Sequence, residues 1–421
     1  MSLSSPLMTA ALVVAGSIVC SSNVKASAEV RMSSGSESAE FQTAPIQNAA
    51  ELEARMQKGL PPLEALTPFG KREFLRGLLW GQKGLSTFSV KSMARELSAD
   101  QIIALAGVFG IESYVQSLLS RAEKYPPLRL INPTKERVEH YYEMDDRRRR
   151  EQTMIDDESG LSRQDFAPLL QEFDRRFGQD LKPHNLKALS DSDLVLVFDS
   201  VSSIAFVSLD AKLIGQQRQV FDELQRRGID TRRDINQQVL QNMIRLREFN
   251  QAREFIVSHP DLQDTKIPHV DDQLGSNFTG RSVFAYDAET NTLRRQALRF
   301  ENGKQLIMVV NSACEFSKRA LAAIDEDVVF AKAVRQAKLV IVTPPSAAPP
   351  LFFISNWNAK HPDQTIRVAA DRTEWQEIDK PGVPMFYLYE NGKISKVIEG
   401  WQGQKTRDLL LQTLGIVEKA P

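Results

Sequence analysis

The sequence predicts a chain of two parts (α + α/β): a helical, repeat-like N-terminal region followed by an α/β domain. From about residue 49 to residue 265, apolar side chains recur at helical spacing. From about Asn277 onward, short apolar runs of strand length alternate with helical segments, the order typical of a layered α/β fold. A chain of 421 residues is long enough for roughly two to three domains.

The composition excludes several classes of protein. Lys+Arg number 53 and Asp+Glu 54, whereas a nucleic-acid-binding protein carries a basic excess, so we expect no nucleic-acid partner. Two cysteines, Cys20 and Cys314, are too few for a disulfide scaffold or a thiolate zinc site. No two of the five histidines stand three or four positions apart, so a helical metal pair is excluded. We expect neither a metal nor a cofactor.

Residues 1–28 have the pattern of a secretory signal peptide. The stretch from Leu7 to Cys20 is uncharged, and it is shorter than the about 20 apolar residues of a membrane-spanning helix. An Ala-x-Ala cleavage signature ends at Ala28. Residues 29–48, rich in serine and glutamate, are interpreted as a flexible leader. We therefore expect a secreted or periplasmic protein without a membrane span, in which cleavage has removed Cys20.

Two alternatives to this interpretation stay open. One is a lipoprotein anchored at Cys20, although the residues before it lack the leucine and the small last residue of such a site. The other is an uncleaved apolar N-terminal anchor. The cleaved signal peptide is favoured over both, although residues 1–6 lack the basic residue that such a segment usually has.

Residues 49–134 are predicted to be a helical region. The pattern begins near Ala49 and includes a helix over Lys71–Trp80. Ser98 and Gln101 have capping-box spacing before another helix. A further helix over Glu112–Lys124 is expected to stop before two prolines. Residues 135–160 form a charged linker or helix; acidic residues flank four consecutive arginines, so a solvated helix is favoured over a site for an acidic partner.

Residues 161–265 are predicted to form helical hairpins. The segment Arg247–Arg253 resembles the turn and second helix of a tetratricopeptide repeat, although the full repeat consensus is absent. Stacked helical hairpins bury one face and can present the other to a protein partner. A plain helical scaffold without a partner is the alternative. Four helices are expected, at about residues 190–207, 211–227, 234–246 and 250–258.

Residues 277–421 are predicted to be the α/β domain. A β-hairpin opens it, and a last helix over Lys405–Leu414 closes it. The parallel strands should end at one sheet edge, which places the proline-rich loop Thr343–Pro350 near Cys314. Between hairpin and last helix we expect strands at Gln305–Val310, Lys338–Val342, Thr365–Ala369, Met385–Tyr389 and Ile394–Ile398, and helices after Cys314 and over Leu351–Lys360.

Three features of this domain resemble the thioredoxin superfamily. A Cys-x-x-Ser motif, Cys314 to Ser317, comes straight after a strand, and Val383-Pro384 comes straight before one. The run from Phe386 to Lys393 then closes a hairpin. The resemblance implies a cis peptide bond before Pro384, which faces the cysteine. It also implies that Val383 and Pro384 bind substrate, together with Glu315 and Phe316 beside the cysteine.

The position of Cys314 suits thiolate chemistry. A cysteine at a helix N-terminus faces unpaired backbone N–H groups and the positive end of the helix dipole, and both favour the thiolate. The thiolate is the nucleophile in thiol–disulfide exchange. Ser317, one turn on, is expected to donate a hydrogen bond to it. Lys318 and Arg319 add positive potential, which Glu315 offsets.

Ser317 stands where dithiol members of the superfamily have their resolving cysteine. Without Cys20 the chain cannot form an internal disulfide, so we expect monothiol exchange with a protein thiol or disulfide client or a small thiol, or capture of a client thiol. The motif Cys-Glu-Phe-Ser is also similar to the Cys-Gly-Phe-Ser of monothiol glutaredoxins, which bind an iron–sulfur cluster. Glu315 in place of glycine, and export, argue against a cluster. The alternative function is a non-enzymatic binding or scaffold protein with an inert Cys314.

Other residues carry weaker signals. Asp371, Glu374 and Glu377 precede the Val-Pro motif and are either near the site or part of a solvated loop, with the loop favoured. Trp357, Trp375 and Trp401 are expected to pack within this domain, with a place lining a substrate groove as the alternative for Trp375. The sequence contains neither a glycine-rich phosphate loop nor the Gly-x-Ser-x-Gly motif of a serine nucleophile.

Overall fold

The computed structural model describes residues 18–19, 44–81, 84–153, 166–300, 303–380 and 382–416. Apart from Ile18–Val19, the predicted signal peptide with Cys20 lies outside the described residues, and so does most of the predicted leader. Within the described parts, none of the helices combines the length and the apolar character needed to cross a membrane. The chain forms two compact units, the first made of Met1–Tyr141, Phe177–Ser200 and Gln216–Gln238, and the second of Tyr142–Arg176, Val201–Gly215 and Val239–Pro421.

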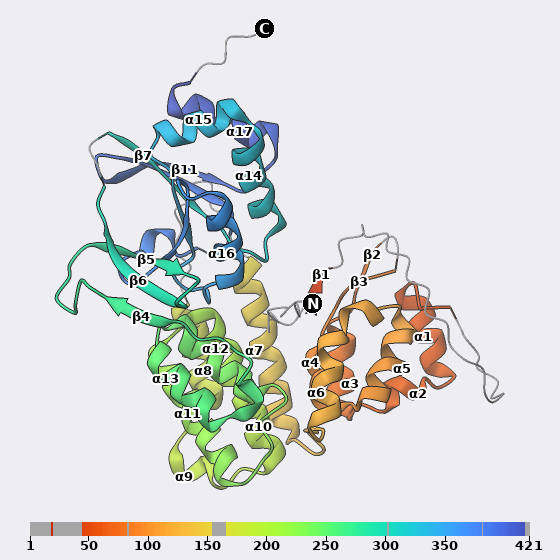
Figure 1. Cartoon of the computed structure of the whole chain (residues 1–421). Helices are drawn as coiled ribbons and strands as arrows, with labels where there is room; N and C mark the ends of the chain where they lie inside the picture. Colours follow the sequence, from red (N-terminus) through yellow and green to blue (C-terminus); the bar gives the residue numbers. More distant parts are fainter. Residues whose placement is uncertain are drawn as a thin grey trace, which may run out of the picture. The chain divides into compact units, whose positions relative to one another are not determined.

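The N-terminal part of the first unit is a set of short helices around an apolar core (Figure 1). The predicted capping box at Ser98 is confirmed: its hydroxyl accepts from the N–H of Gln101, whose side chain accepts from the N–H of Ser98. The elements are α1 (Ala49–Gln57), α2 (Pro61–Glu64), α3 (Pro68–Arg76), α4 (Lys91–Glu96), α5 (Ala99–Phe109), a 3-10 turn (Glu112–Tyr114) and α6 (Gln116–Lys124), with strands β1 (Ile18–Val19), β2 (Leu79–Gly81) and β3 (Gly84–Phe88).

The predicted helix over Lys71–Trp80 is wrong at its C-terminal end. Helix α3 stops at Arg76, and Gly77, a poor helix former, caps it. Trp80 instead lies in β2, which pairs antiparallel with β3. The sheet order is β1-β3-β2. Pairing with a later strand therefore overrides the apolar pattern, which continues past the end of the helix.

Among the described residues that follow, there are seven α-helices, and they include the four predicted between residues 190 and 258. Ser190 caps one of them, because its hydroxyl accepts from the N–H of Asp193 at 3.1 Å. In the charged stretch, Arg148 and Arg149 both contact Asp145, at 2.6 and 2.8 Å, so its described part is a helix with paired charges. The structure does not confirm a helical repeat. The helices are α7 (Lys135–Thr153), α8 (Ala167–Phe177), α9 (Pro183–Leu186), α10 (Asp191–Ser208), α11 (Ala211–Arg226), α12 (Ile235–Arg245) and α13 (Phe249–Ser258).

The C-terminal part of the second unit is built on an eight-stranded mixed sheet of order β11-β10-β7-β8-β9-β5-β6-β4. Strands β7, β8 and β9 are parallel, and β10 runs antiparallel to β7. The chain is thus of mixed α and β class, as predicted. The strands are β4 (His269–Asp272), β5 (Arg281–Asp287), β6 (Thr292–Leu298), β7 (Lys304–Val309), β8 (Val340–Thr343), β9 (Ile366–Ala369), β10 (Met385–Glu390) and β11 (Lys393–Glu399).

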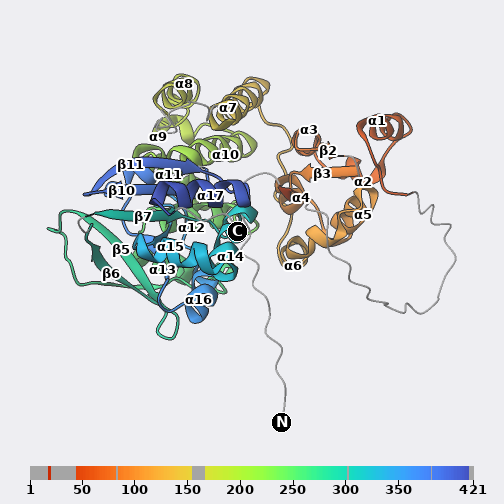
Figure 2. The same ribbon diagram turned by 90° about the horizontal axis from the view of Figure 1, so that it is seen from above.

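Alternation along the strands gives the sheet two apolar faces. On one face, Tyr387 packs with Val309 of β7 and with Trp375 and Ile378 from the segment before the Val-Pro motif. On the other, Phe386 and Phe330 both contact Trp401, with ring centroids 6.1 and 5.7 Å apart. Figures 1 and 2 show the helices gathered beside the sheet: α14 (Glu315–Glu326), α15 (Val328–Gln336), α16 (Leu351–Lys360) and α17 (Gln404–Leu414).

Candidate functional site

Cys314 stands in the turn between β7 and α14. Strand β7 ends at Val309, and the N–H of Val310 still bonds to Val342 of β8, at 2.9 Å. The side chain of Asn311 then accepts from the N–H of Ala313 at 3.0 Å, an arrangement that asparagine favours in turns. Cys314 is the N-cap of α14, and its carbonyl accepts the N–H of Lys318 at 3.2 Å. The expected position at a helix N-terminus is therefore confirmed.

The structure brings Cys314 against the Val-Pro motif, 69 positions later in the chain. The Sγ of Cys314 lies 3.1 Å from the carbonyl oxygen of Val383, to which the thiol donates. The peptide bond between Val383 and Pro384 is cis, as the resemblance implied. Pro384 is buried, and its carbonyl accepts the N–H of Gly400 at 2.8 Å. Cys314 itself is half-buried, so the thiol has a backbone partner and retains exposure.

Ser317 faces inward from the first turn of α14. It is fully buried, and its hydroxyl accepts from the N–H of Asn311 at 3.3 Å. No hydrogen bond joins this hydroxyl to the thiol of Cys314 within the part of the chain that the structure describes. The side chain therefore stabilises the strand-to-helix turn, and its expected donation to the thiolate stays a prediction.

Glu315 and Phe316 point outward from the same turn. Glu315 pairs with Lys318 at 3.3 Å, and both side chains are about half exposed, so this pair contributes at most about 1 kcal/mol. The ring of Phe316 is 54% exposed, with the guanidinium of Arg319 at 6.0 Å from its centroid. An exposed aromatic ring two residues from the thiol is available to a substrate.

Of the three acidic residues before the Val-Pro motif, Glu374 and Glu377 bond to the strands of the sheet, whereas the exposed Asp371 accepts from Thr373 within the loop. Glu374 accepts from the N–H and hydroxyl of Ser282, at 2.5 and 2.7 Å, and from Arg295 at 2.6 Å. Glu377 accepts from the hydroxyl of Tyr389 at 3.0 Å. The expected packing of Trp375 within the domain is confirmed and the alternative of a groove position is wrong: the side chain is fully buried and donates to the carbonyl of Ser282 at 2.7 Å. Burying this large apolar ring in the core is more favourable than leaving it exposed in a groove.

The loop Thr343–Pro350 leaves the sheet at the same edge as Cys314. Val342 is the register partner of Val309, so the two parallel strands end side by side. Two arginines about 100 positions earlier in the chain hold this loop, a contact that no local sequence pattern indicates. No group of three or more His, Cys, Asp or Glu side chains suited to a metal ion occurs among the described residues.

Comparisons with known proteins add little to this geometry. No protein-family model matches the sequence, and no curated protein matches it. A solved structure, a thioredoxin-like protein from Bacteroides caccae ATCC 43185, aligns with 57% of this chain and 93% of its own length. The two chains are 11% identical over a superposition with a TM-score of 0.24. A likeness at this level carries no conclusion, so the site rests on its own contacts.

Proposed function

We propose that residues 277–421 form a thioredoxin-like domain of an exported protein, in which Cys314 is the nucleophile of monothiol–disulfide exchange. The observation that carries this function is the contact between the Cys314 thiol and the Val383 carbonyl at 3.1 Å. Through this hydrogen bond, the cysteine at the start of a helix contacts the Val-Pro motif, which is the arrangement that the superfamily resemblance implies. Cys314 is also only partly buried, which supports access to the residue.

The reaction consists of two thiol–disulfide exchanges, and each moves one proton from the attacking thiol to the departing thiolate. The Cys314 thiol gives up its proton, and the thiolate attacks one sulfur of a client disulfide. A bond forms between Sγ and that sulfur, the client S–S bond breaks, and the departing thiolate takes up a proton. Once the signal peptide is cleaved near Ala28, no second cysteine remains to resolve this mixed disulfide. An external thiol therefore attacks the client sulfur of the mixed disulfide and forms a disulfide with it as the bond to Cys314 breaks. The external thiol gives up its proton, and the departing Cys314 thiolate takes one up.

Intact-mass analysis after incubation with glutathione disulfide tests this function. A chain carrying Cys20→Ser should gain one glutathione per molecule, attached at Cys314, and reduced glutathione should remove it. A chain that gains no adduct under conditions where a free cysteine peptide does would contradict the proposed function. The experiment uses the full chain, so both units remain present.

A further inference from the structure

The loop Thr343–Pro350 is poor in groups that could hold it in place. Four of its eight residues are prolines, which have no N–H to donate. Its Ser346 N–H bonds to Asp379 at 3.2 Å, and the N–H of Ala347 bonds to Pro344 at 3.1 Å. Since buried carbonyls also need partners, the donors that reach the loop's carbonyls decide its conformation.

Two arginines from the end of α12 supply those donors. Arg247 donates to the carbonyls of Pro345 and Ala347, at 2.9 and 2.8 Å, and Arg245 donates to Ser346 at 2.8 Å. Three consecutive carbonyls of the loop are thus held by two guanidinium groups. Arg247 also donates to Ala369, the last residue of β9, at 3.3 Å. All these residues belong to the second unit.

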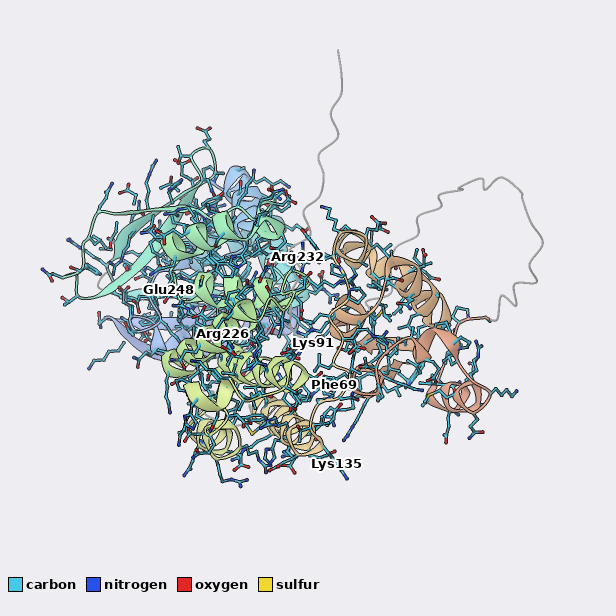
Figure 3. The ribbon with its side chains drawn as sticks, turned by 90° about the horizontal axis from the view of Figure 1, so that it is seen from below. Phe69, Lys91, Lys135, Arg226, Arg232 and Glu248 are labelled. Atoms are coloured by element: carbon cyan, nitrogen blue, oxygen red, sulfur yellow. The ribbon has the colours of Figure 1, made fainter. Side chains whose placement is uncertain are left out.

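Arg247 occupies a backbone position that favours glycine. It follows α12 with a φ of 63°, in the left-handed region. Its N–H bonds to Ile244 at 3.0 Å, and the N–H of Glu248, labelled in Figure 3, bonds to Met243 at 2.9 Å. This is the Schellman motif, whose left-handed position favours glycine because a Cβ crowds the following carbonyl there.

The guanidinium of Arg247 is also costly to bury. Burial lowers the pKa of Arg247 to about 10, although Asp379 and Asp371 act in the other direction. A strained backbone and a buried cation at one residue are both unfavourable unless the contacts of the side chain offset their cost. For Arg247, these contacts are the hydrogen bonds that hold the loop.

We propose that Arg247, aided by Arg245, is a positioning residue for polypeptide clients at Cys314. It fixes the Thr343–Pro350 loop as a rigid wall at the sheet edge where the thiol lies. This role rests on the proposed exchange function. A polypeptide that reaches Cys314 meets the wall, whereas a small disulfide reaches the thiol without it. The turn between α12 and α13 thereby governs which clients the thiol accepts.

Two glycine variants test the role of Arg247. Arg247→Gly removes the strain of the left-handed backbone and also removes the guanidinium that bonds to the loop carbonyls. Lys338→Gly relieves the same strain at the end of α15, where Lys338 has a φ of 49° and an exposed side chain. For an unfolded polypeptide with one disulfide, Arg247→Gly should lower the exchange rate constant by about tenfold or more, since small misplacements of binding groups cost up to about 10²-fold. With glutathione disulfide, the exchange rate constant of Arg247→Gly should equal that of wild type. Lys338→Gly should have the wild-type rate constant with both the polypeptide and glutathione disulfide.

Hydrogen exchange at Ser346 and Ala347 separates this role from the proposed function. Both amides should exchange faster in Arg247→Gly and stay unchanged in Lys338→Gly. Equal rates of polypeptide exchange in the two variants, or unchanged loop amides in Arg247→Gly, would overturn the positioning role. If wild type reacts with neither disulfide, the exchange function itself fails, whatever the loop amides show.

Discussion

Replacing Cys314 with alanine is expected to abolish mixed-disulfide formation and leave the fold intact. The thiolate is the nucleophile, and alanine offers none. The Sγ contact to Val383 is a single hydrogen bond at a half-buried position, so its loss should change the free energy of unfolding by about 1 kcal/mol or less. Intact mass with glutathione disulfide measures the reaction, and amide hydrogen exchange over α14 measures the fold.

Ser317→Ala is the matched control for this substitution. Because the Ser317 hydroxyl accepts from Asn311, its removal should disturb the turn and change the rate of adduct formation only several-fold. An adduct on a Cys314→Ala chain that also lacks Cys20 would show that cysteine chemistry is not responsible. If wild type and Cys314→Ala behave alike while substitutions on an exposed helical face impair the protein, the non-enzymatic binding function is favoured.

Substituting Arg95 with methionine is expected to cause the largest loss of stability, in the first unit. Arg95 is 3% exposed and lies in α4, near Lys91, which is labelled in Figure 3. It contacts Asp199 at 2.5 and 2.9 Å and Asp234 at 2.5 and 3.2 Å. Removing one partner of a buried ion pair costs about 3–5 kcal/mol, because the other charge stays buried. Hydrogen exchange of the α4 and α5 amides measures the effect.

The loss from Arg95→Met should shrink as the pH falls. Burial acts to raise the pKa of Asp199, but Arg95 and Lys91 outweigh it and hold the pKa below its usual value. The carboxylate therefore contributes stability above its unfolded pKa of about 4, and this is lost as the pH falls through the lower folded value. Arg95→Met lacks much of that contribution, so the difference in the free energy of unfolding between wild type and variant should become smaller in acid.

An exposed arginine provides the control for Arg95. Arg72 is about half exposed and pairs with Glu139 at 3.1 Å, so Arg72→Met should cost no more than about 1 kcal/mol. Equal hydrogen-exchange protection of the α4 and α5 amides in Arg95→Met and Arg72→Met would contradict a stabilising role for the buried ion pairs of Arg95. A difference in stability between wild type and Arg95→Met that grows as the pH falls would also contradict it.

The features predicted well from the sequence are those set within a few residues. The strand ending at Val309, the helix beginning after Cys314 and the hairpin of β10 and β11 each follow from apolar patterns and turn residues. The capping box at Ser98 follows from a spacing of three. The pairing of Cys314 with Val383 required the superfamily resemblance, because no local pattern joins positions 69 apart.

The features that were missed depend on contacts distant in the chain. Arg95 reaches partners 104 and 139 positions away, and Arg247 reaches a loop 98 positions away. In the sequence, each resembles an ordinary arginine on a helix surface. Ser317 is a different case: a spacing of one helical turn allows its hydroxyl to face either the thiol or the turn, so its donation to the thiolate stays a prediction. In the structure its hydroxyl accepts from the N–H of Asn311, just past the end of β7.

The rate at which Cys314 reacts with glutathione disulfide, compared with the same residues as a free peptide, tests the central claim most directly. The peptide covers residues 311–319, so it contains the cysteine and its neighbours without the helix start or the Val383 carbonyl. If the fold makes Cys314 a nucleophile, the full chain with Cys20→Ser should react about tenfold or more faster at pH 7, because a reacting group held in place gains rate over a mobile one. An equal or slower rate in the full chain would contradict the account.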